Sequence, residues 1–285
     1  MTGFWEGLLG NAFWAAAIKV VAAFALLLVT TLILVWLERK VVADMQNRIG
    51  PARAGPFGIL QTVADGIKLF FKEHVTPRKV ELGMYLAAPV AAMIPAFLIF
   101  LVIPVGRPFH VGQTEVTLQV TDLNVALLFI LAMSSLAVYS VVLAGWASGS
   151  KYPLLGGVRA MAQMISYEAA MGLALVPVVL FASSRIAGGD IGVGTMSMSK
   201  IVELQQGGIW GPLPAWFVFW LFPSFVLFFI SAVAETNRAP FDLVEAEQEL
   251  VGGYNTEYSG IRFALFFLAE YINMFNVSAI AVTVF

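Results

Sequence analysis

Long hydrophobic runs alternate along this chain with shorter polar connections. An α-helix needs about 20 mostly apolar residues to cross the hydrocarbon core of a bilayer. Six runs meet this requirement, and they lie at residues 12–36, 82–105, 122–146, 159–183, 214–234 and 261–285. The first run is too long for a cleaved signal and has no basic region before it. The pattern predicts an all-α polytopic membrane protein, a single transmembrane domain over residues 1–285 with about six transmembrane helices.

One amphipathic segment, residues 58–72, is too short to span a bilayer. Its large apolar side chains recur at helical spacing, while polar side chains occupy the opposite face. The apolar set is Ile59, Leu60, Val63, Ile67, Phe70 and Phe71, and the polar set is Gln61, Asp65, Lys68 and Lys72. We expect a helix lying on the membrane surface, within a loop at residues 48–80.

Residues 114–120 have a different pattern, because Val116, Leu118 and Val120 alternate with polar residues. Gly112 and Gln113 precede them as a turn. The alternation predicts a short β-hairpin in the connection between the second and third spans.

Basic residues are distributed unevenly between the two sides of the predicted bundle. One side holds Arg39, Lys40, Arg48, Arg53, Lys68, Lys72, Arg78, Lys79, Lys151, Arg159, Arg238 and Arg262, and the other holds Arg107, Arg185 and Lys200. Lys and Arg accumulate in cytoplasmic loops of membrane proteins. The N-terminus is therefore predicted to lie outside, and the 48–80 and 235–260 loops in the cytoplasm.

Composition restricts the chemistry that the chain itself can carry. The sequence is 60% hydrophobic and 12% charged, and it contains no cysteine and two histidines, His74 and His110, far apart. This excludes a cysteine-ligated iron–sulfur cluster, a CxxC redox pair or a cysteine–histidine zinc site within the chain. We expect no metal site and no catalytic redox group, so that any electrons are carried by another subunit.

Acidic residues concentrate in the stretch 235–260, which reads ETNRAPFDLVEAEQELVGGYNTEYSG. It contains a single cation, Arg238, and six carboxylates: Glu235, Asp242, Glu245, Glu247, Glu249 and Glu257. Carboxylates held together repel one another, which favours protonation or cationic partners. If 242–250 is helical, Asp242, Glu245 and Glu249 share a face. The alternative is an ordinary solvated loop.

Two further glutamates fall inside predicted spans: Glu168 in RAMAQMISYEAAMG and Glu270 in FFLAEYINMF. An ionised group near the bilayer centre costs about 2.5–3.5 kcal/mol on insertion scales. We therefore expect both to face the protein interior or a hydrated cavity and to exchange protons. The alternative is a structural glutamate hydrogen-bonded to a neighbouring helix.

Several runs together resemble one known family. They are LERKVVADMQNRIGPARAGPFGILQTVADGIKLFFKE, GWASGSKYPLLGGVRAMAQMISYE, AETNRAPFDLVEAEQELVGGYNTEYSG and FFLAEYINM. From about Trp36 to its end the chain resembles the membrane-arm protein of respiratory complex I, the proton-pumping NADH:quinone oxidoreductase, that is called subunit 1 in mitochondria. That family has about eight spans, so the resemblance implies two further helices beyond Phe285.

The resemblance implies a membrane-arm heel subunit that forms the entrance of a quinone tunnel and starts the path coupling quinone reduction to proton pumping. The proton-coupling carboxylates it implies are Glu168, Glu235, Asp242, Glu245, Glu247, Glu249 and Glu270. The quinone-entrance residues it implies are Glu38, Arg39, Arg48, Arg53, Phe57, Asp65 and Lys68. For the basic residues among them, the alternative is a topology signal with lipid head-group contacts.

The same resemblance implies quinone as the substrate, with FMN and iron–sulfur clusters in partner subunits. It implies other membrane-arm and peripheral-arm subunits as partners, no nucleic acid, and a bacterial plasma membrane or an energy-converting organelle inner membrane as the location.

Two alternatives remain open. The first is the equivalent subunit of a membrane-bound hydrogenase or of a ferredoxin-fed quinone reductase, which the co-purifying electron-input subunit would distinguish. The second is a free-standing cation/proton transporter, which fits the intramembrane glutamates. A dense acidic loop and a flat basic surface helix fit a transporter poorly, because they imply a docked partner.

Overall fold

The computed structural model describes residues 12–111, 114–186, 195–206, 208–210, 213–242 and 251–285. Its long helices are α2 (Ala12–Met45), α4 (Leu82–Phe100), α5 (Ala126–Ala147), α6 (Lys151–Ile186), α9 (Phe222–Glu235) and α11 (Ile261–Val284). Within these described residues, five helices are long and apolar enough to cross a membrane, and α9 is a shorter apolar helix. The prediction of an all-α polytopic membrane protein is confirmed.

Two helices extend well past the apolar runs that predicted them. The α2 helix continues from the predicted end at residue 36 to Met45, through Glu38, Arg39 and Lys40. The α6 helix begins at Lys151 rather than at residue 159. Hydropathy marks the part of a helix that lipid surrounds, whereas charged residues such as Glu, Lys and Arg are themselves good helix formers.

The fifth predicted span, 214–234, is not one helix. A short helix, α8 (Phe217–Trp220), ends at Leu221, whose φ of −114° and ψ of 32° are not helical, and α9 then begins at Phe222. Pro223 lies in the first turn of α9. Proline lacks an N–H and is tolerated in a first turn but not in a helix interior. The break before Pro223 makes this the shortest of the six segments.

The predicted surface helix is present as α3 (Leu60–Phe71), preceded by a single 3-10 turn, η1 (Pro56–Gly58). Part of its apolar face is highly exposed, with Phe71 88% accessible. Gly58 has φ +79°, and a Cβ there would lie 2.2 Å from the Pro51 carbonyl oxygen. Only glycine fits this tight path, which folds the loop before α3 back on itself.

On the opposite end of the molecule, β1 (Phe109–Val111) and β2 (Thr114–Val116) pair as an antiparallel hairpin. The predicted hairpin is confirmed, although β2 ends at Val116 rather than continuing along the alternation to residue 120. The same end carries α7 (Met198–Gln205) and a second small hairpin, β3 (Gly208–Trp210) with β4 (Leu213–Pro214).

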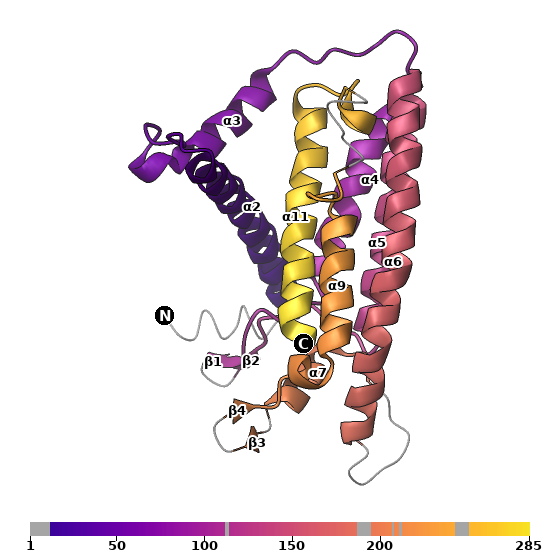
Figure 1. Cartoon of the computed structure of the whole chain (residues 1–285). Helices are drawn as coiled ribbons and strands as arrows, with labels where there is room; N and C mark the ends of the chain where they lie inside the picture. The colour runs from indigo at the N-terminus through magenta and orange to yellow at the C-terminus, as the bar shows by residue number, and fades with distance from the viewer. Residues whose placement is uncertain (1–11, 112–113, 187–194, 207, 211–212, 243–250) are drawn as a thin grey trace.

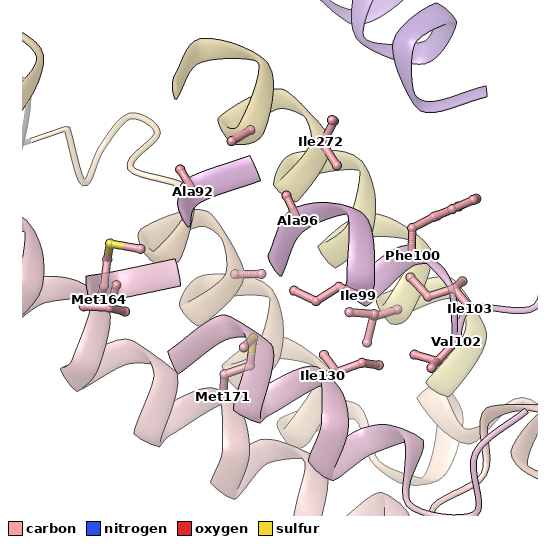
Figure 2. Close-up of a cluster of buried hydrophobic side chains, with 14 of the residues drawn as sticks. Ala92, Ala96, Ile99, Phe100, Val102, Ile103, Ile130, Met164, Met171 and Ile272 are labelled. Atoms are coloured by element: carbon pink, nitrogen blue, oxygen red, sulfur yellow. The ribbon is translucent and has the colours of Figure 1, made fainter. Parts of the chain in front are cut away.

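Helices α4, α5, α6, α9 and α11 run alongside one another as a bundle, and α2 leans away from it toward the α3 end (Figure 1). Small side chains such as Ala92 and Ala96 of α4 lie in the core with Met164 of α6 and Ile272 of α11 (Figure 2). Without a strong hydrophobic driving force in lipid, close packing of small residues is a main source of helix association.

The polar connection before α11 is held against α6 by a backbone contact. A Cβ on Gly156 of α6 would lie 2.7 Å from the Cα of Gly253, in the 3-10 turn η2 (Gly253–Asn255). Just after this turn, Tyr258 is buried and stacks on Tyr85 of α4, with ring centroids 4.3 Å apart. These contacts place the end of the acidic stretch directly over the bundle.

Candidate functional site

Arg238 is the centre of the candidate site, because its guanidinium reaches carboxylates from two distant helices. Its Nη1 lies 3.1 Å from Glu38 Oε1 of α2, and its Nε lies 3.1 Å from Glu270 Oε1 of α11. The guanidinium carbon is 4.6 Å from the centre of the Tyr271 ring, and the Tyr271 hydroxyl donates to Glu38 Oε2. We call Glu38, Arg238, Glu270 and Tyr271 the arginine network.

The charge of Arg238 is secured by these partners. Burial by itself lowers the pKa of Arg238, but Glu270, then Tyr271 and Glu38, together outweigh burial and raise the pKa above its ordinary value. Arg238 therefore stays positive and faces two carboxylates, so the network holds one more acidic group than basic groups.

The carboxylates of Glu168 and Glu235 meet two consecutive serines of α5. Ser134 donates to Glu235 Oε1 of α9, and Ser135 donates to Glu168 Oε1 of α6. Successive side chains on a helix point about 100° apart, so each carboxylate has its own hydroxyl, and the two are close enough for their charges to interact. Glu168 and Glu235 are each partly exposed, and Ser134 is buried.

Gln163 of α6 holds the segment that carries Arg238. Its Nε2 lies 2.8 Å from the Ala234 carbonyl oxygen, 2.9 Å from the Phe241 carbonyl oxygen and 3.2 Å from Asn237 Oδ1. Through these contacts one side-chain amide joins both ends of the turn after α9. The position of Arg238 between Glu38 and Glu270 is thus fixed from the α6 side.

Two small cavities lie inside the bundle beside these groups. One has a volume of about 40 Å³ and touches Glu270, Glu235 and Asn273, and the other, about 30 Å³, touches Glu235, Asn273 and Asn276. A cavity of 10–15 Å³ on this measure can hold a water molecule when it is polar. Polar groups on α11 at positions 270, 273 and 276 therefore line a row of water-sized spaces that passes Glu235.

A second cluster joins α2 to the surface helix α3. Arg39 Nη1 pairs with Asp65 Oδ2, and Lys68 Nζ lies 3.8 Å from Asp65 Oδ1. Burial raises the pKa of Asp65, but the hydrogen bond and charge of Arg39 outweigh it, and the net pKa is below the usual value. Asp65 is therefore ionised at neutral pH and holds α3 next to α2. We call Arg39, Asp65 and Lys68 the rim cluster.

The remaining predicted entrance residues lie on the exposed loop between α2 and α3. Arg48 and Arg53 are exposed, and the Arg48 Nε donates to Gln46 Oε1 at 2.7 Å. The Phe57 side chain is 79% exposed, while its backbone carbonyl accepts from Trp36 Nε1 at 3.0 Å. The structure thus separates the predicted entrance set into the rim cluster, these loop residues and Glu38, which belongs to the arginine network.

In the acidic loop, Asp242 is exposed. Glu245, Glu247 and Glu249, and with them the predicted helix at 242–250, lie outside the described residues. Over the part of the chain that the structure describes, no group of three or more His, Asp or Glu residues is arranged to hold a metal ion.

A larger groove of about 800 Å³ runs along α9 and α11. Its walls are apolar side chains such as Phe225, Phe229 and Val277, and Arg238 is at its edge. Phe229 is itself 57% exposed, so the groove is an open apolar face of two helices, and its volume alone identifies no ligand.

Several of these residues were not singled out by sequence reasoning. They are Ser134, Ser135, Gln163, Tyr271, Asn273 and Asn276. Two signals pointed toward four of them: the adjacent serines 134 and 135 within an apolar span, and the asparagines 273 and 276, spaced three apart after Glu270. Arg238 stood out as the only cation of the acidic stretch, without a partner assigned.

Comparison with known families adds one finding. A family model described as NADH dehydrogenase matches residues 18–285. The match covers both the arginine network and the rim cluster, together with every residue that the sequence predicted to be functional.

Proposed function

Because this chain belongs to the NADH dehydrogenase family, which is the subunit 1 family of respiratory complex I, we propose that it couples quinone reduction to proton translocation. The chain is a membrane-embedded subunit of a multi-subunit oxidoreductase. In the proposal, the quinone enters beside α2 and α3, and a row of carboxylates in the bundle carries the proton-coupled response.

The observation that carries the proposal is the double pairing of Arg238 with Glu38 and Glu270. One guanidinium faces two carboxylates, so Glu38 and Glu270 share a single positive charge. If the charge around Glu38 changes, the attraction between Arg238 and Glu270 changes in response. A charge change at the α2 end therefore alters the proton affinity of a carboxylate in α11.

The entrance is supported by the combination of apolar surface and basic groups around α3. An isoprenoid tail would gain affinity from apolar contacts with α2 and α3. Arg39 and Lys68, with Arg48 and Arg53 on the adjoining loop, would orient the polar quinone head group. In the proposal, the electrons come from FMN and iron–sulfur clusters in partner subunits, and this chain itself has no cysteine to ligate a cluster.

The proton path is supported by the way in which the carboxylates are partnered. Glu270 belongs to the arginine network, Glu235 lies next to it across a small cavity, and Glu168 follows on α6, held by the serine next to the one that binds Glu235. Asp242, with Glu245, Glu247 and Glu249 in the same connection, would supply protons from the aqueous side. The proposed orientation has the N-terminus outside and this connection in the cytoplasm or its organelle equivalent.

The test uses Glu235→Gln and Glu270→Gln in the assembled complex, with proton pumping and NADH:quinone reductase activity measured together. Each substitution keeps the side-chain volume and removes the exchangeable proton, so we expect both activities to fall while assembly, seen on native gels, persists. Glu203→Gln, a change on α7 at the other end of the molecule, is the control. Pumping that stays unchanged in both variants would remove these carboxylates from the path.

A further inference from the structure

The connector between α3 and α4, residues 72–81, is held by the far end of the acidic stretch 235–260. Ser259 Oγ accepts from the Val75 backbone N–H at 2.9 Å and donates to the Val75 carbonyl oxygen at 3.3 Å. One hydroxyl therefore engages both backbone groups of a residue 184 positions away. Val75 belongs to no helix or strand, so Ser259 supplies hydrogen bonds that regular secondary structure does not provide there.

Arg262, in the first turn of α11, makes a second contact with the connector. Its Nη1 donates to Thr76 Oγ1 at 2.8 Å, and its guanidinium carbon lies 5.3 Å from the centre of the Tyr85 ring in α4, close enough for a cation–π attraction. The Tyr85 hydroxyl in turn donates to the Glu257 carbonyl oxygen at 2.6 Å. The positive end of a helix dipole disfavours a cation in the first turn, so helix formation does not account for an arginine at this position.

The third contact is made by the backbone of Gly260. This residue has φ +59°, and a Cβ there would lie 2.8 Å from His74 Nδ1 and 3.3 Å from the Lys72 carbonyl oxygen. Any other residue would be strained and would push the connector away. The connector has little other support from burial, because Val75 is 60% exposed. Its position depends on a few contacts with residues 259–262.

We propose that Ser259, Gly260 and Arg262 are positioning residues for the surface helix α3, acting through the connector. The connector leaves α3 directly after Phe71 and crosses to the end of the bundle where α11 begins (Figure 1). The rim cluster holds the middle of α3 to α2, at Asp65. The contacts with residues 259–262, which we call the connector clasp, hold the C-terminal end of α3 to the bundle.

The connector clasp makes the quinone entrance dependent on residues outside it. The proposed entrance lies beside α2 and α3, so a helix held at its middle but released at one end would present its apolar face differently to a quinone tail. A long isoprenoid tail contacts more of that face than a short one. This consequence rests on the proposed function, whereas the clasp itself can be observed without any turnover.

The experiment compares the assembled wild-type complex with Ser259→Ala, which removes both hydrogen bonds to Val75. Ser259→Thr keeps the hydroxyl and is the rescue variant. Ser278→Ala is the matched control, because Ser278 is an exposed serine of α11 whose hydroxyl donates to the Met274 carbonyl oxygen of its own helix. Hydrogen–deuterium exchange is measured by mass spectrometry on peptides that cover α3 and residues 72–78. The KM and kcat are measured with a short-chain and a long-chain quinone.

In Ser259→Ala we expect exchange over residues 72–78 to accelerate by about fivefold, the factor for loss of one hydrogen bond, and the last turn of α3 to exchange faster as well. The KM for the long-chain quinone should rise more than that for the short-chain quinone, with kcat nearly unchanged. Ser259→Thr and Ser278→Ala should behave as the wild type.

Gly260→Ala is the second variant and should loosen the same peptides more strongly. Adding His74→Ala removes the imidazole atoms that the new Cβ would meet, so the double variant should recover part of the loss. Unchanged exchange in both Ser259→Ala and Gly260→Ala would overturn the inference, and so would faster exchange over residues 72–78 that leaves α3 unaffected. Faster exchange in α3 with unchanged KM for both quinones would support the clasp and count against the entrance in the proposed function.

Discussion

The arginine network and the rim cluster both join α2 to another helix through an arginine and a carboxylate, but their surroundings differ. The side chains of Arg238 and Glu270 are 27% and 15% exposed, whereas Arg39 is 43% and Lys68 is 68% exposed. Glu38, at 40%, is exposed about as much as Arg39, and Asp65 is 25% exposed, so the Arg238–Glu270 pair is the one that solvent screens least. The same residue types thus form an enclosed ion pair between Arg238 and Glu270 and a more exposed contact between α2 and α3.

The largest effect should come from Arg238→Leu, because it leaves Glu38 and Glu270 without their cation. Removing one partner of a buried ion pair costs about 3–5 kcal/mol, and partial exposure reduces this figure here. We expect poor assembly of the complex on native gels and loss of quinone reductase activity. Arg238→Lys keeps the charge but not the two-directional guanidinium, so it should assemble and yet show weakened pumping. Wild-type behaviour of both variants would contradict the importance of the network.

The next effect concerns the end of the row of polar groups at positions 270, 273 and 276 of α11, where the apolar Ile280 follows one turn later. Ile280→Asn introduces a polar group one turn beyond Asn276, so it should extend the row and let protons leak across the membrane. The measurement is passive proton permeability of proteoliposomes that contain the complex but receive no NADH. Val282→Asn, on the same helix at a residue 86% exposed, is the control. Equal proton leakage in the two variants would argue that Ile280 is not what stops protons from passing beyond Asn276.

The adjacent serines allow a matched comparison of buried and exposed positions. Ser134, which is 5% exposed, donates to Glu235, and Ser135, which is exposed, donates to Glu168. A hydrogen bond to a charged group contributes about 1.5–3 kcal/mol, and water can replace the exposed one. Ser134→Ala should therefore reduce pumping by about tenfold and Ser135→Ala by less than about threefold. The reverse order would show that Glu168, rather than Glu235, is the more critical carboxylate.

At the rim, Arg39→Gln and Asp65→Asn should have smaller effects. Exposed ion pairs are worth about 0–1 kcal/mol, so we expect quinone KM to rise by no more than about fivefold, with kcat nearly unchanged. Because the pKa of Asp65 is lowered in the fold, the stabilising contribution of this pair is present above the usual carboxyl pKa of 3.8 and is lost as pH falls below it. The double variant should match the worse single variant, and additive losses would show that the pair does not act as a unit.

Arg48→Ala should have the smallest effect on assembly, because Arg48 is exposed on the loop between α2 and α3. Its removal should chiefly raise quinone KM, which is measured with a short-chain and a long-chain quinone. Unchanged KM for both quinones would assign Arg48 to membrane topology and head-group contacts instead.

Much of the architecture could be predicted from the sequence, because hydropathy and helical periodicity are local properties. The apolar spans, the α3 helix and the hairpin near residue 111 all follow from neighbouring residues alone. The break at Leu221 is likewise explained by Pro223 alone, since proline is favoured in a first turn over a helix interior.

The partners within the site could not be predicted in the same way. Arg238 pairs with a residue 200 positions earlier, and its selection of Glu38 depends on how α2, α9 and α11 pack. Nothing in the sequence around Asn276 indicates that its side-chain amide donates to the Ala96 carbonyl oxygen of another helix, α4. Such contacts depend on tertiary distances, which no local pattern in the chain specifies.

The meeting of Gly156 with Gly253 also has a consequence for motion. The two backbones touch with no side chain between them, so this contact cannot absorb a displacement by side-chain rearrangement. A shift of the turn at Gly253, at the end of the acidic connection, is therefore transmitted to α6, where Gln163 lies about two helical turns farther on. A docked partner that pushes on this turn would move the amide that holds Arg238 without touching the bundle interior.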